Sequence, residues 1–491
     1  MEHRMLEQTE LLNSVESATS VQPPLVVDLD GTLVKSDLML ESVVALLRRQ
    51  PLYAFILPFW MLRGIARFKQ EVARRVVLDP CLLPWRKDLI HYLEGQRAEG
   101  RSIVLATAAD ARIARQVAGH LRLFDSVLAS DGVTNLSGGS KRDRLVREFG
   151  ERGFDYAGNS RRDLVVWSSA RRAILIDANA DLNPAVTTVT PVDRVFKNER
   201  RSPRDYLKAL RPRNWAKNLL VFVPLLAAHR VQEIGLWGKA ALAFLALGCC
   251  ASAGYLLNDL LDLAADRHHP EKRSRPFAAG TLPLAWAFAM IPALWGLGCV
   301  VGALVSPGFL AALLFYFVLS VTYSLFLKKI VILDVLVLAG LHSVRILAGS
   351  AAVGVGLSHW LLAFSTFLFF SLALVKRYSE LVVMRGVDGG NAHARAYELG
   401  DAELLSAMGT ASGYLAVMVL ALYIASDTAH VLYARRNLLW FLCPLMFYWI
   451  SQVWLTAHRG KMRDDPLVFA ASDRTSRILI LLMVVTVILA Q

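Results

Sequence analysis

Cysteine is scarce in this sequence: five residues in 491, with no metal-ligand spacing between them. Their scatter excludes a disulfide framework and a cysteine-based metal centre. We expect them to be small core side chains. They are Cys81, Cys249, Cys250, Cys299 and Cys443. The polar N-terminus also lacks the apolar run of a signal peptide, and we expect residues 1–20 to be disordered.

Charged residues are few as well, at 19% of the chain against 55% hydrophobic residues. This balance excludes an ordinary soluble enzyme, and the length allows two or more domains. Residues 1–210 carry charges throughout, whereas long apolar blocks alternate with short polar breaks from about Asn218 onward. The composition therefore predicts a soluble N-terminal domain followed by an all-α, polytopic membrane domain.

A membrane-spanning helix needs roughly 20 mostly apolar residues. The first of about nine candidate spans contains His229, Arg230 and Glu233, and the last is short. The candidates are 218–236, 237–257, 282–305, 307–327, 330–352, 359–376, 404–425, 438–457 and 478–490.

The breaks after the second, fourth, sixth and eighth spans are basic, and those after the third and fifth are neutral. Positive charge on alternate sides predicts a multi-pass protein of the cytoplasmic membrane with its basic breaks and N-terminal domain in the cytoplasm. The loop "YARRN" after the seventh span is the exception. Topology and contact with anionic lipid explain much of the net charge of +13, so we expect no nucleic-acid partner.

Four stretches of the N-terminal region place polar groups at or near strand ends: "LVVDLDGTL", "RSIVLATAAD", "SGGSKRDRL" and "FDYAGNSRRDLVVW". In an open parallel α/β sheet, ligands bind at the carboxyl ends of the strands. The candidate site residues are Asp28, Asp30, Thr107, Lys141, Asn159 and Asp163.

Together these stretches resemble the four motifs of the haloacid dehalogenase (HAD) phosphohydrolase superfamily. The resemblance implies a Rossmann-like parallel sheet over residues 21–196, with Asp28 as the nucleophile and Asp30 as the acid and base. Thr107 and Lys141 would hold phosphoryl oxygens. Mg²⁺ would be bound by Asp28, the Asp30 carbonyl, Asn159 and Asp163. Many relatives have aspartate in place of Asn159, so the alternative is a domain kept as a scaffold.

A helical cap, at about 37–90, is expected between the first two motifs. It contains the apolar segment "PLYAFILPFWMLRGIARFK", residues 51–69, with basic flanks. Two interpretations stay open: an interfacial membrane helix that lets the cap reach a lipid-borne substrate, or a buried cap helix. Residues 197–217 then form a basic juxtamembrane linker.

The stretch "NDLLDLAAD" begins at Asn258 and spaces Asp259, Asp262 and Asp266 at i, i+3 and i+7, which is one face of a helix. Three carboxylates there repel one another unless a cation lies among them, and Mg²⁺ with a diphosphate suits them. The cations that follow can clamp phosphate oxygens: Arg267, Lys272, Arg273 and Arg275. The alternative is a solvated juxtamembrane loop.

This stretch resembles the Asp-rich motif of the UbiA superfamily of intramembrane prenyltransferases. The likeness extends over 205–491 and includes "RPRNWAKNLLVFVP" and "YSLFLKK". It implies a transferase domain at 218–491, with further substrate-binding residues at Lys217, Asn218, Tyr323 and Lys328.

After the sixth span, a basic substrate-binding site replaces the second acidic motif of aromatic prenyltransferases: Lys376, Arg377 and Glu380. A basic site suits a ligand phosphate without its own metal. This pattern is similar to the decaprenyl-phosphate phosphoribosyltransferase branch. It implies transfer of 5-phosphoribosyl from phosphoribosyl diphosphate to a polyprenyl phosphate, with release of diphosphate. Lys376 and Arg377 would hold either the ribose 5-phosphate or the lipid phosphate. The HAD-like domain would then remove the 5-phosphate, giving a lipid-linked pentose for a cell-envelope or surface glycan.

Two alternatives remain: a prenyltransferase that joins a prenyl diphosphate to an aromatic or other small acceptor, with the HAD-like domain as a scaffold, and a non-enzymatic lipid-binding scaffold. The expected partners are phosphoribosyl diphosphate, polyprenyl phosphate and the bilayer, with both active sites on the cytoplasmic face. Self-association into a homo-oligomer is left open.

Overall fold

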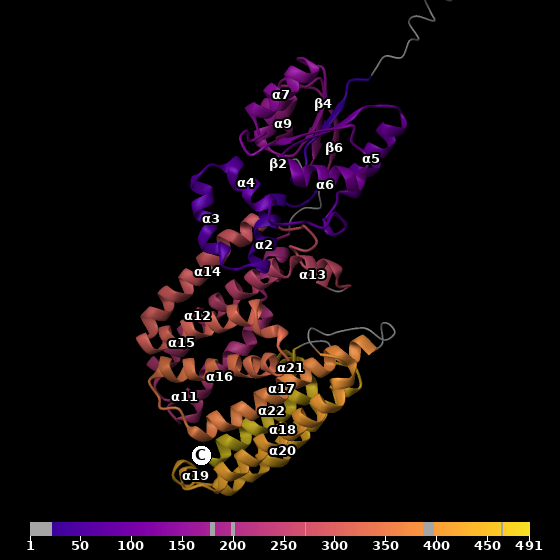
Figure 1. Ribbon diagram of the computed structural model, residues 1–491. Helices are drawn as coiled ribbons and strands as arrows, with labels where there is room; N and C mark the ends of the chain where they lie inside the picture. Colours follow the sequence, from indigo (N-terminus) through magenta and orange to yellow (C-terminus); the bar gives the residue numbers. More distant parts are fainter. Residues whose placement is uncertain (1–21, 177–181, 198–201, 271, 386–396, 463–464) are drawn as a thin grey trace, which may run out of the picture. The chain divides into compact units, whose positions relative to one another are not determined.

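The computed structural model describes residues 22–176, 182–197, 202–270, 272–385, 397–462 and 465–491 (Figure 1). The expected disorder at 1–20 lies outside these residues. The chain divides into two compact units. The first contains residues up to Tyr206 and the segment Asp259–Trp286, and the second contains Leu207–Asn258 and Ala287–Gln491. The Asp-rich stretch, apart from Asn258, therefore belongs to the same unit as the N-terminal motifs.

The first unit is built on a parallel six-stranded sheet with strand order β3-β2-β1-β4-β5-β6. Val26 of β1 pairs with Val104 of β2 on one side and with Tyr156 of β4 on the other. The order reverses between β1 and β4, which is where open α/β sheets bind ligands. The strands are β1 (Leu25–Val27), β2 (Ile103–Asp110), β3 (Ser126–Ser130), β4 (Asp155–Gly158), β5 (Ala173–Ile176) and β6 (Val192–Phe196).

Both faces of this sheet are covered, because successive side chains of a strand point to opposite faces. Leu25 and Val27 pack in the core that includes α5 (Lys87–Ala98) and α6 (Ala111–Leu121). Val26 packs in the opposite core with α7 (Gly139–Phe149), α8 (Leu164–Trp167) and α9 (Leu182–Thr187). The expected parallel α/β sheet is confirmed.

The region between β1 and β2 is helical, as predicted. It contains α2 (Leu38–Arg49), α3 (Tyr53–Leu62), α4 (Ile65–Ala73) and the short 3₁₀ helix η1 (Pro80–Leu82). The Asp37 side chain caps α2 by accepting a hydrogen bond from the Leu40 backbone N–H at 3.0 Å. The unit also contains α13 (Leu263–His268) and the 3₁₀ helix η4 (Lys272–Ser274), and α10 (Pro203–Leu210) begins in it and ends in the second unit.

Among the described residues, seven helices are long and apolar enough to cross a membrane. They confirm seven of the nine expected spans and make this a multi-pass membrane protein. The helices are α12 (Ile234–Leu261), α14 (Leu284–Val305), α15 (Pro307–Leu325), α16 (Leu333–Val353), α17 (His359–Arg385), α18 (Ala402–Ala425) and α20 (Leu442–His458). Two 3₁₀ turns extend the last two helices at their N-termini: η6 (Leu399–Asp401) precedes α18, and η7 (Arg436–Phe441) precedes α20.

The first and last expected spans differ from the other seven. Residues 218–236 are divided among the 3₁₀ helix η3 (Pro212–Phe222), α11 (Val223–Ala227) and the start of α12. The break between α11 and α12 carries the Arg230–Glu233 ion pair and a left-handed His229. Residues 478–490 lie in α22 (Arg474–Ala490), an apolar helix of 17 residues. The remaining short helices of this unit are η5 (Leu327–Lys329), α19 (Asp427–Leu432) and α21 (Pro466–Ser472).

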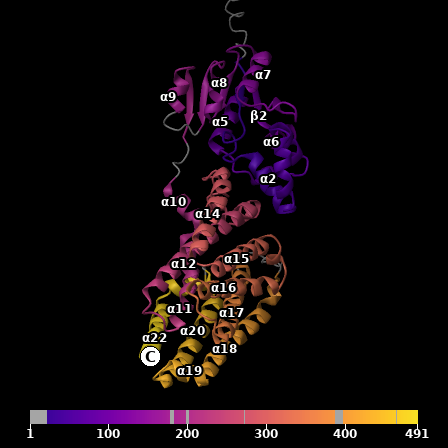
Figure 2. The same ribbon diagram turned by 90° about the vertical axis from the view of Figure 1, so that its left-hand side faces the viewer.

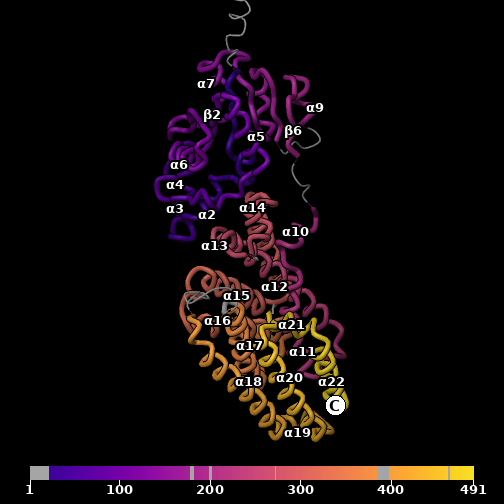
Figure 3. Tube along the Cα trace, turned by 90° about the vertical axis from the view of Figure 1, so that its right-hand side faces the viewer, coloured from indigo at the N-terminus to yellow at the C-terminus, as the bar shows by residue number. Residues whose placement is uncertain are grey.

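The core of the second unit lies where α16, α17, α18 and α20 pack along one another (Figures 2 and 3). Trp454 of α20 lies against Gly409 of α18, where an added Cβ would come within 2.1 Å of the indole ring. Glycine at this position lets the two helices approach closely. The Trp454 indole nitrogen also donates to the Ser371 hydroxyl of α17 at 3.1 Å, which joins three helices.

Candidate active sites

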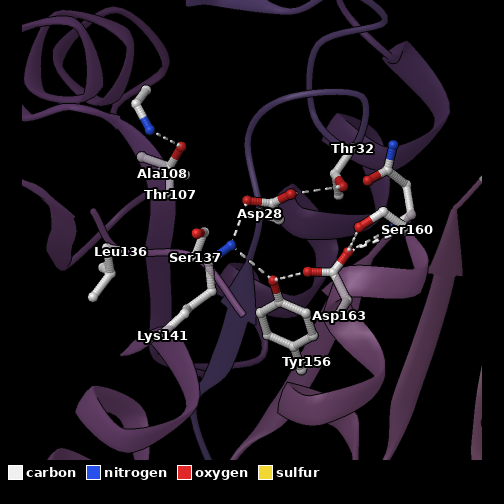
Figure 4. Close-up of polar contacts among 12 residues, drawn as sticks. Asp28, Thr32, Thr107, Ala108, Leu136, Ser137, Lys141, Tyr156, Ser160 and Asp163 are labelled. Atoms are coloured by element: carbon white, nitrogen blue, oxygen red, sulfur yellow. Dashed lines mark hydrogen bonds and ion pairs between the residues drawn. The ribbon is translucent and has the colours of Figure 1, made fainter. Parts of the chain in front are cut away.

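The first candidate site lies at the carboxyl edge of β1 (Figure 4). Asp28 directly follows the strand, and its Oδ1 accepts a hydrogen bond from Lys141 Nζ of α7 at 2.7 Å. Lys141 also donates to the Tyr156 hydroxyl at 3.0 Å, and that hydroxyl donates to Asp163 Oδ1 at 2.9 Å. The structure thus brings Asp28, Lys141 and Asp163 together, as the motif spacing predicts.

Asp163 is held in place by the loop that precedes it. Its Oδ2 accepts hydrogen bonds from the Ser160 backbone N–H at 2.9 Å and the Ser160 hydroxyl at 2.8 Å. The Asn159 backbone N–H donates to the same oxygen at 3.2 Å. The Asn159 side chain lies against Gly31, where a Cβ would come within 2.1 Å of the amide nitrogen. Asn159 therefore packs on the loop that contains Asp28 and Asp30.

Burial changes the ionisation of both motif aspartates. It raises the pKa of Asp28, with Lys141 opposing this shift and the Asp163 carboxylate adding to it. Burial, followed by the nearby Asp37 carboxylate, raises the pKa of Asp30 to about 7. Asp30 Oδ1 accepts a hydrogen bond from the Leu38 backbone N–H at 2.9 Å, at the start of α2. A carboxyl group that titrates near neutral pH suits proton transfer in both directions.

Thr107 is fully buried near the carboxyl end of β2, where its hydroxyl accepts from the Ala109 backbone N–H at 3.0 Å. Lys69 of α4 was not predicted from the sequence, although its Nζ donates to the Ala108 carbonyl at 2.7 Å and to Asn135 Oδ1 at 2.9 Å. Burial lowers the pKa of Lys69, and the Asp30 carboxylate opposes this shift. The helical cap therefore brings a cation to this edge of the sheet.

The second candidate site is the Asp-rich stretch, which is not one continuous helix. Helix α12 ends at Leu261 and α13 begins at Leu263, so Asp262 stands at a break. Asp259 Oδ1 and Asp266 Oδ2 nevertheless converge on Arg275 Nη1, at 3.2 and 2.6 Å. Asp262 Oδ1 is 3.8 Å from Arg48 Nη1 of α2. The expected single helical face is therefore replaced by a bend that gathers two of the three carboxylates.

Arg267 is bound by a side chain that the sequence did not indicate. Its guanidinium donates to both carboxylate oxygens of Glu41 of α2, at 2.7 and 2.8 Å, and to the Ala278 carbonyl at 3.1 Å. Both side chains of this pair are buried. Lys272 and Arg273 lie in η4 and are exposed. These two are the exposed members of the four expected phosphate clamps.

The third candidate site is a polar cluster inside the second unit. Asp465 Oδ2 accepts from Lys217 Nζ at 2.6 Å and from Lys376 Nζ at 3.3 Å. His342 lies in α16, the helix that also carries Arg345. Asn218 Oδ1 accepts from Arg345 Nε at 3.0 Å. Asn218 Nδ2 and His342 Nδ1 are buried without a hydrogen-bond partner among the described residues.

Arg377 lies next to Lys376 in sequence but in a different environment. Its guanidinium is fully buried and donates to Asp334, to Glu380 Oε2 at 2.7 Å and to the Tyr323 hydroxyl at 2.8 Å. Each nitrogen of the Arg377 guanidinium thus has a protein acceptor, so this side chain organises its surroundings instead of facing an open site.

The structure also brings two other expected substrate-binding residues together. Lys328 Nζ lies 3.4 Å from Asn258 Oδ1.

The first two sites contain carboxylate oxygens, which are the protein ligands that Mg²⁺ prefers. The Asp28–Asp163 pair and the Asp259–Asp266 pair each place like charges where a cation is favourable. Among the described residues no group of three or more His, Cys, Asp or Glu side chains is close enough to form a metal cluster. Lys141 and Arg275 supply the positive charge at these carboxylates.

Known proteins resemble this chain in sequence and in fold. A model described as the UbiA prenyltransferase family matches residues 219–472. The uncharacterized protein y4nM of Sinorhizobium fredii is 34% identical over 457 residues, which cover 92% of this chain and 88% of that protein. Decaprenyl-phosphate phosphoribosyltransferase of Mycobacterium tuberculosis is 34% identical over 180 residues, which cover 36% of this chain and 59% of that enzyme. A solved UbiA homologue from Archaeoglobus fulgidus, bound to GPP and Mg²⁺, aligns with 57% of this chain and 99% of its own at 17% identity and a TM-score of 0.44.

Proposed function

This chain belongs to the UbiA prenyltransferase family, and we propose that it is a phosphoribosyltransferase with a polyprenyl phosphate acceptor and a fused phosphatase. The observation that carries the transferase assignment is the basic cluster of Lys217 and Lys376 around Asp465. A phosphate group can be held there without a second metal ion. The partial similarity to decaprenyl-phosphate phosphoribosyltransferases supports the same substrate class.

In the transfer step, an oxygen of the lipid phosphate attacks C1 of the ribose and the bond from C1 to the diphosphate oxygen breaks. We assign Asp259, Asp262 and Asp266 to Mg²⁺ and the leaving diphosphate. When bound, the ion would offset the charge of the diphosphate. Arg275 orients Asp259 and Asp266, and the exposed Lys272 and Arg273 can bind diphosphate oxygens.

We assign the remaining phosphate, either the ribose 5-phosphate or the lipid phosphate, to Lys217 and Lys376. Asp465 lies between the two ammonium groups and limits their repulsion. Asn218 Nδ2 and His342 Nδ1 are buried polar atoms without a protein partner among the described residues, so a bound substrate can satisfy them. Arg377 is assigned a positioning role, because its buried guanidinium is bonded to Asp334, Glu380 and Tyr323.

We assign dephosphorylation of the product to the sheet edge. An Asp28 oxygen attacks the phosphorus of the 5-phosphate and the ester bond breaks, while Asp30 donates a proton to the leaving 5-oxygen. Asp30 then takes a proton from the water that hydrolyses the aspartyl-phosphate. Lys141 and Thr107 would hold the phosphoryl oxygens, and Asp28, the Asp30 carbonyl, Asn159 and Asp163 would hold Mg²⁺. The Asp30 pKa of about 7 supports both proton transfers.

The second candidate function is prenyl transfer to an aromatic or other small acceptor, which the family name favours. Membranes that contain the protein are incubated with ribose-labelled phosphoribosyl diphosphate and polyprenyl phosphate, or with a labelled prenyl diphosphate and an aromatic acceptor. We expect the lipid extract of the first reaction to contain labelled ribosyl lipid, and we expect no labelled product in the second reaction. A labelled prenylated acceptor and no ribosyl lipid would replace our assignment with prenyl transfer.

A further inference from the structure

Helix α3 exposes apolar side chains along its whole length. None of its ten residues is buried. Leu52, Phe55, Phe59 and Leu62 expose 75%, 75%, 67% and 85% of their surface. Ile56, Met61 and Ile65 are also exposed. A contiguous apolar surface of this kind is rare on a protein that faces only water and marks a binding surface.

The helix is fixed to a well-packed neighbour. Gly64, with φ of 99°, makes the sharp turn between α3 and α4, a backbone conformation that favours glycine. Helix α4 buries Phe68 and Val72. Trp60 of α3 packs on Tyr53 with ring centroids 5.4 Å apart, and the Arg75 guanidinium lies 4.5 Å from the Trp60 ring. The exposed face is therefore held in a defined place by the fold.

The charges around α3 match an anionic lipid surface. Between Glu41 and Glu71 the sequence contains no Asp or Glu. Arg49, Arg63 and Arg67 flank the apolar residues and are exposed. Tyr and Trp, both present in α3, are enriched where a protein meets the polar boundary of a bilayer. Basic residues near such a surface are attracted to anionic headgroups.

The length of α3 indicates whether it can span a membrane or lie in its interface. Ten residues span about 15 Å, roughly half the hydrocarbon thickness, so α3 cannot cross a bilayer. An apolar helix of this size with basic flanks instead lies in the plane of the interface. We propose that α3 is an interfacial anchor that inserts its apolar side chains into the membrane that contains the spanning helices, with anionic lipid as its partner.

This anchor also bears on the site at the carboxyl edge of β1. Helix α4, which continues from α3 after Gly64, carries Lys69, whose Nζ contacts the Ala108 carbonyl beside Thr107. Insertion of α3 would therefore hold the Lys69 side of the site at the surface where a lipid-linked phosphate is presented. This consequence rests on the proposed phosphatase function, whereas the anchor itself rests on exposure and charge.

The test places an environment-sensitive fluorophore on the full-length protein in nanodiscs that contain anionic lipid. The probe is attached at Phe59→Cys, with Val133→Cys as the matched control because Val133 is 90% exposed in the turn after β3. Both variants carry Cys81→Ser, since Cys81 is exposed. We expect spin-labelled lipid to quench the probe at position 59 and iodide to quench the probe at 133.

Quenching of position 59 by iodide, as at 133, would overturn the proposal, because the helix would then face water. Protection from both quenchers would also overturn it, because a protein or a second copy of the chain would cover the helix. Neither readout depends on catalysis, so failure of the proposed phosphatase function leaves the test intact.

A second variant tests the consequence for the site. Phe55→Ser, Phe59→Ser and Leu62→Ser are combined in one protein, because none of these side chains contributes to a buried core. We expect phosphate release from a phosphorylated lipid in a bilayer to fall several-fold, with hydrolysis of soluble p-nitrophenyl phosphate unchanged. An equal loss with both substrates, or no loss with either, would contradict the lipid-presenting role.

Discussion

Asp262 lies at the bend between α12 and α13 and is half-buried, with Arg48 Nη1 at 3.8 Å. We predict that Asp262→Asn abolishes ribosyl transfer, because it removes a negative charge from the proposed Mg²⁺–diphosphate site. A partly exposed ion pair contributes about 1 kcal/mol or less, so the melting temperature should change little. Diphosphate release and thermal unfolding are the two measurements.

Asp193→Asn is the matched control, because Asp193 forms a partly exposed ion pair with Arg172 in the same unit. It should leave transfer unchanged. Diphosphate release by Asp262→Asn at the wild-type rate, with Mg²⁺ present, would remove Asp262 from the metal site.

Lys376 and Arg377 are adjacent but should respond differently. Lys376→Ala removes one hydrogen bond to a charged phosphate, which is worth roughly 1.5–3 kcal/mol. We therefore predict that kcat/KM for the substrate whose phosphate it holds falls by about 10- to 150-fold. Steady-state kinetics with phosphoribosyl diphosphate and with polyprenyl phosphate varied in turn identify which substrate that is. A kcat/KM within twofold of wild type for both substrates would place the phosphate elsewhere.

Arg377→Ala should instead act through stability. It leaves Asp334 buried without the guanidinium, and loss of one partner of a buried ion pair costs about 3–5 kcal/mol. We predict a clear fall in melting temperature. Arg377→Lys should recover only part of the loss, because a single ammonium cannot reach Asp334, Glu380 and Tyr323 together. A melting temperature equal to that of wild type in Arg377→Ala, with a selective rise in KM, would instead favour direct phosphate binding.

At the scale of elements, α2 connects two parts of the first unit. Its first backbone N–H groups bond Asp30 and Asp37, and one turn later Glu41 forms the buried ion pair with Arg267. Farther along the helix, Arg48 Nη1 donates to the Leu261 carbonyl at 2.9 Å. Helix α2 thus supports the segment that carries the Asp-rich stretch.

We predict that Glu41→Arg and Arg267→Glu each loosen this segment, because each places like charges face to face in a buried position. The double variant Glu41→Arg/Arg267→Glu should restore much of the lost order. Hydrogen exchange of the α13 amides measures the effect. Glu233→Arg, which breaks the exposed Arg230–Glu233 pair, is the control and should not change exchange in α13. If the double variant exchanges as fast as the single variants, the pair does not hold the segment.

The sequence predicted the features that depend only on the local pattern of residues. Asp28 and Asp163 come after short apolar strands and Lys141 lies in the first turn of α7, so a parallel sheet brings them together at one edge. Seven spans could be predicted because length and apolarity alone specify them. Residues 218–236 could not, since His229 and the Arg230–Glu233 pair interrupt an otherwise apolar run.

Other features depend on contacts that no local pattern encodes. Arg267 meets Glu41 across 226 positions of sequence, and Lys69 reaches Ala108 only because α4 packs near β2. The aspartates have the i, i+3, i+7 spacing in sequence that a straight helix would also have, so the spacing could not reveal the bend at Asp262. The exposure of α3 decides against the buried cap helix that the sequence left open.

At the scale of the whole molecule, the proposed reactions are consecutive, and the proposed sites do not share a residue. Asp28 follows β1 in the first unit, which also contains the Asp-rich stretch, and Lys217 and Lys376 lie in the helical unit. Loss of the second reaction should therefore leave the first intact and let its product accumulate. This separability follows from the central claim that one chain carries out both transfer and dephosphorylation.

The most direct test of this claim is mass spectrometry of lipids extracted after membranes with wild-type or variant protein are incubated with phosphoribosyl diphosphate and polyprenyl phosphate. We predict polyprenyl-phosphoryl-ribose with the wild type, its 5-phosphorylated precursor with Asp28→Asn, and neither lipid with Asp262→Asn. Dephosphorylated ribosyl lipid at the wild-type level with Asp28→Asn would contradict the fused phosphatase. Absence of both ribosyl lipids with the wild type would contradict the transferase assignment itself.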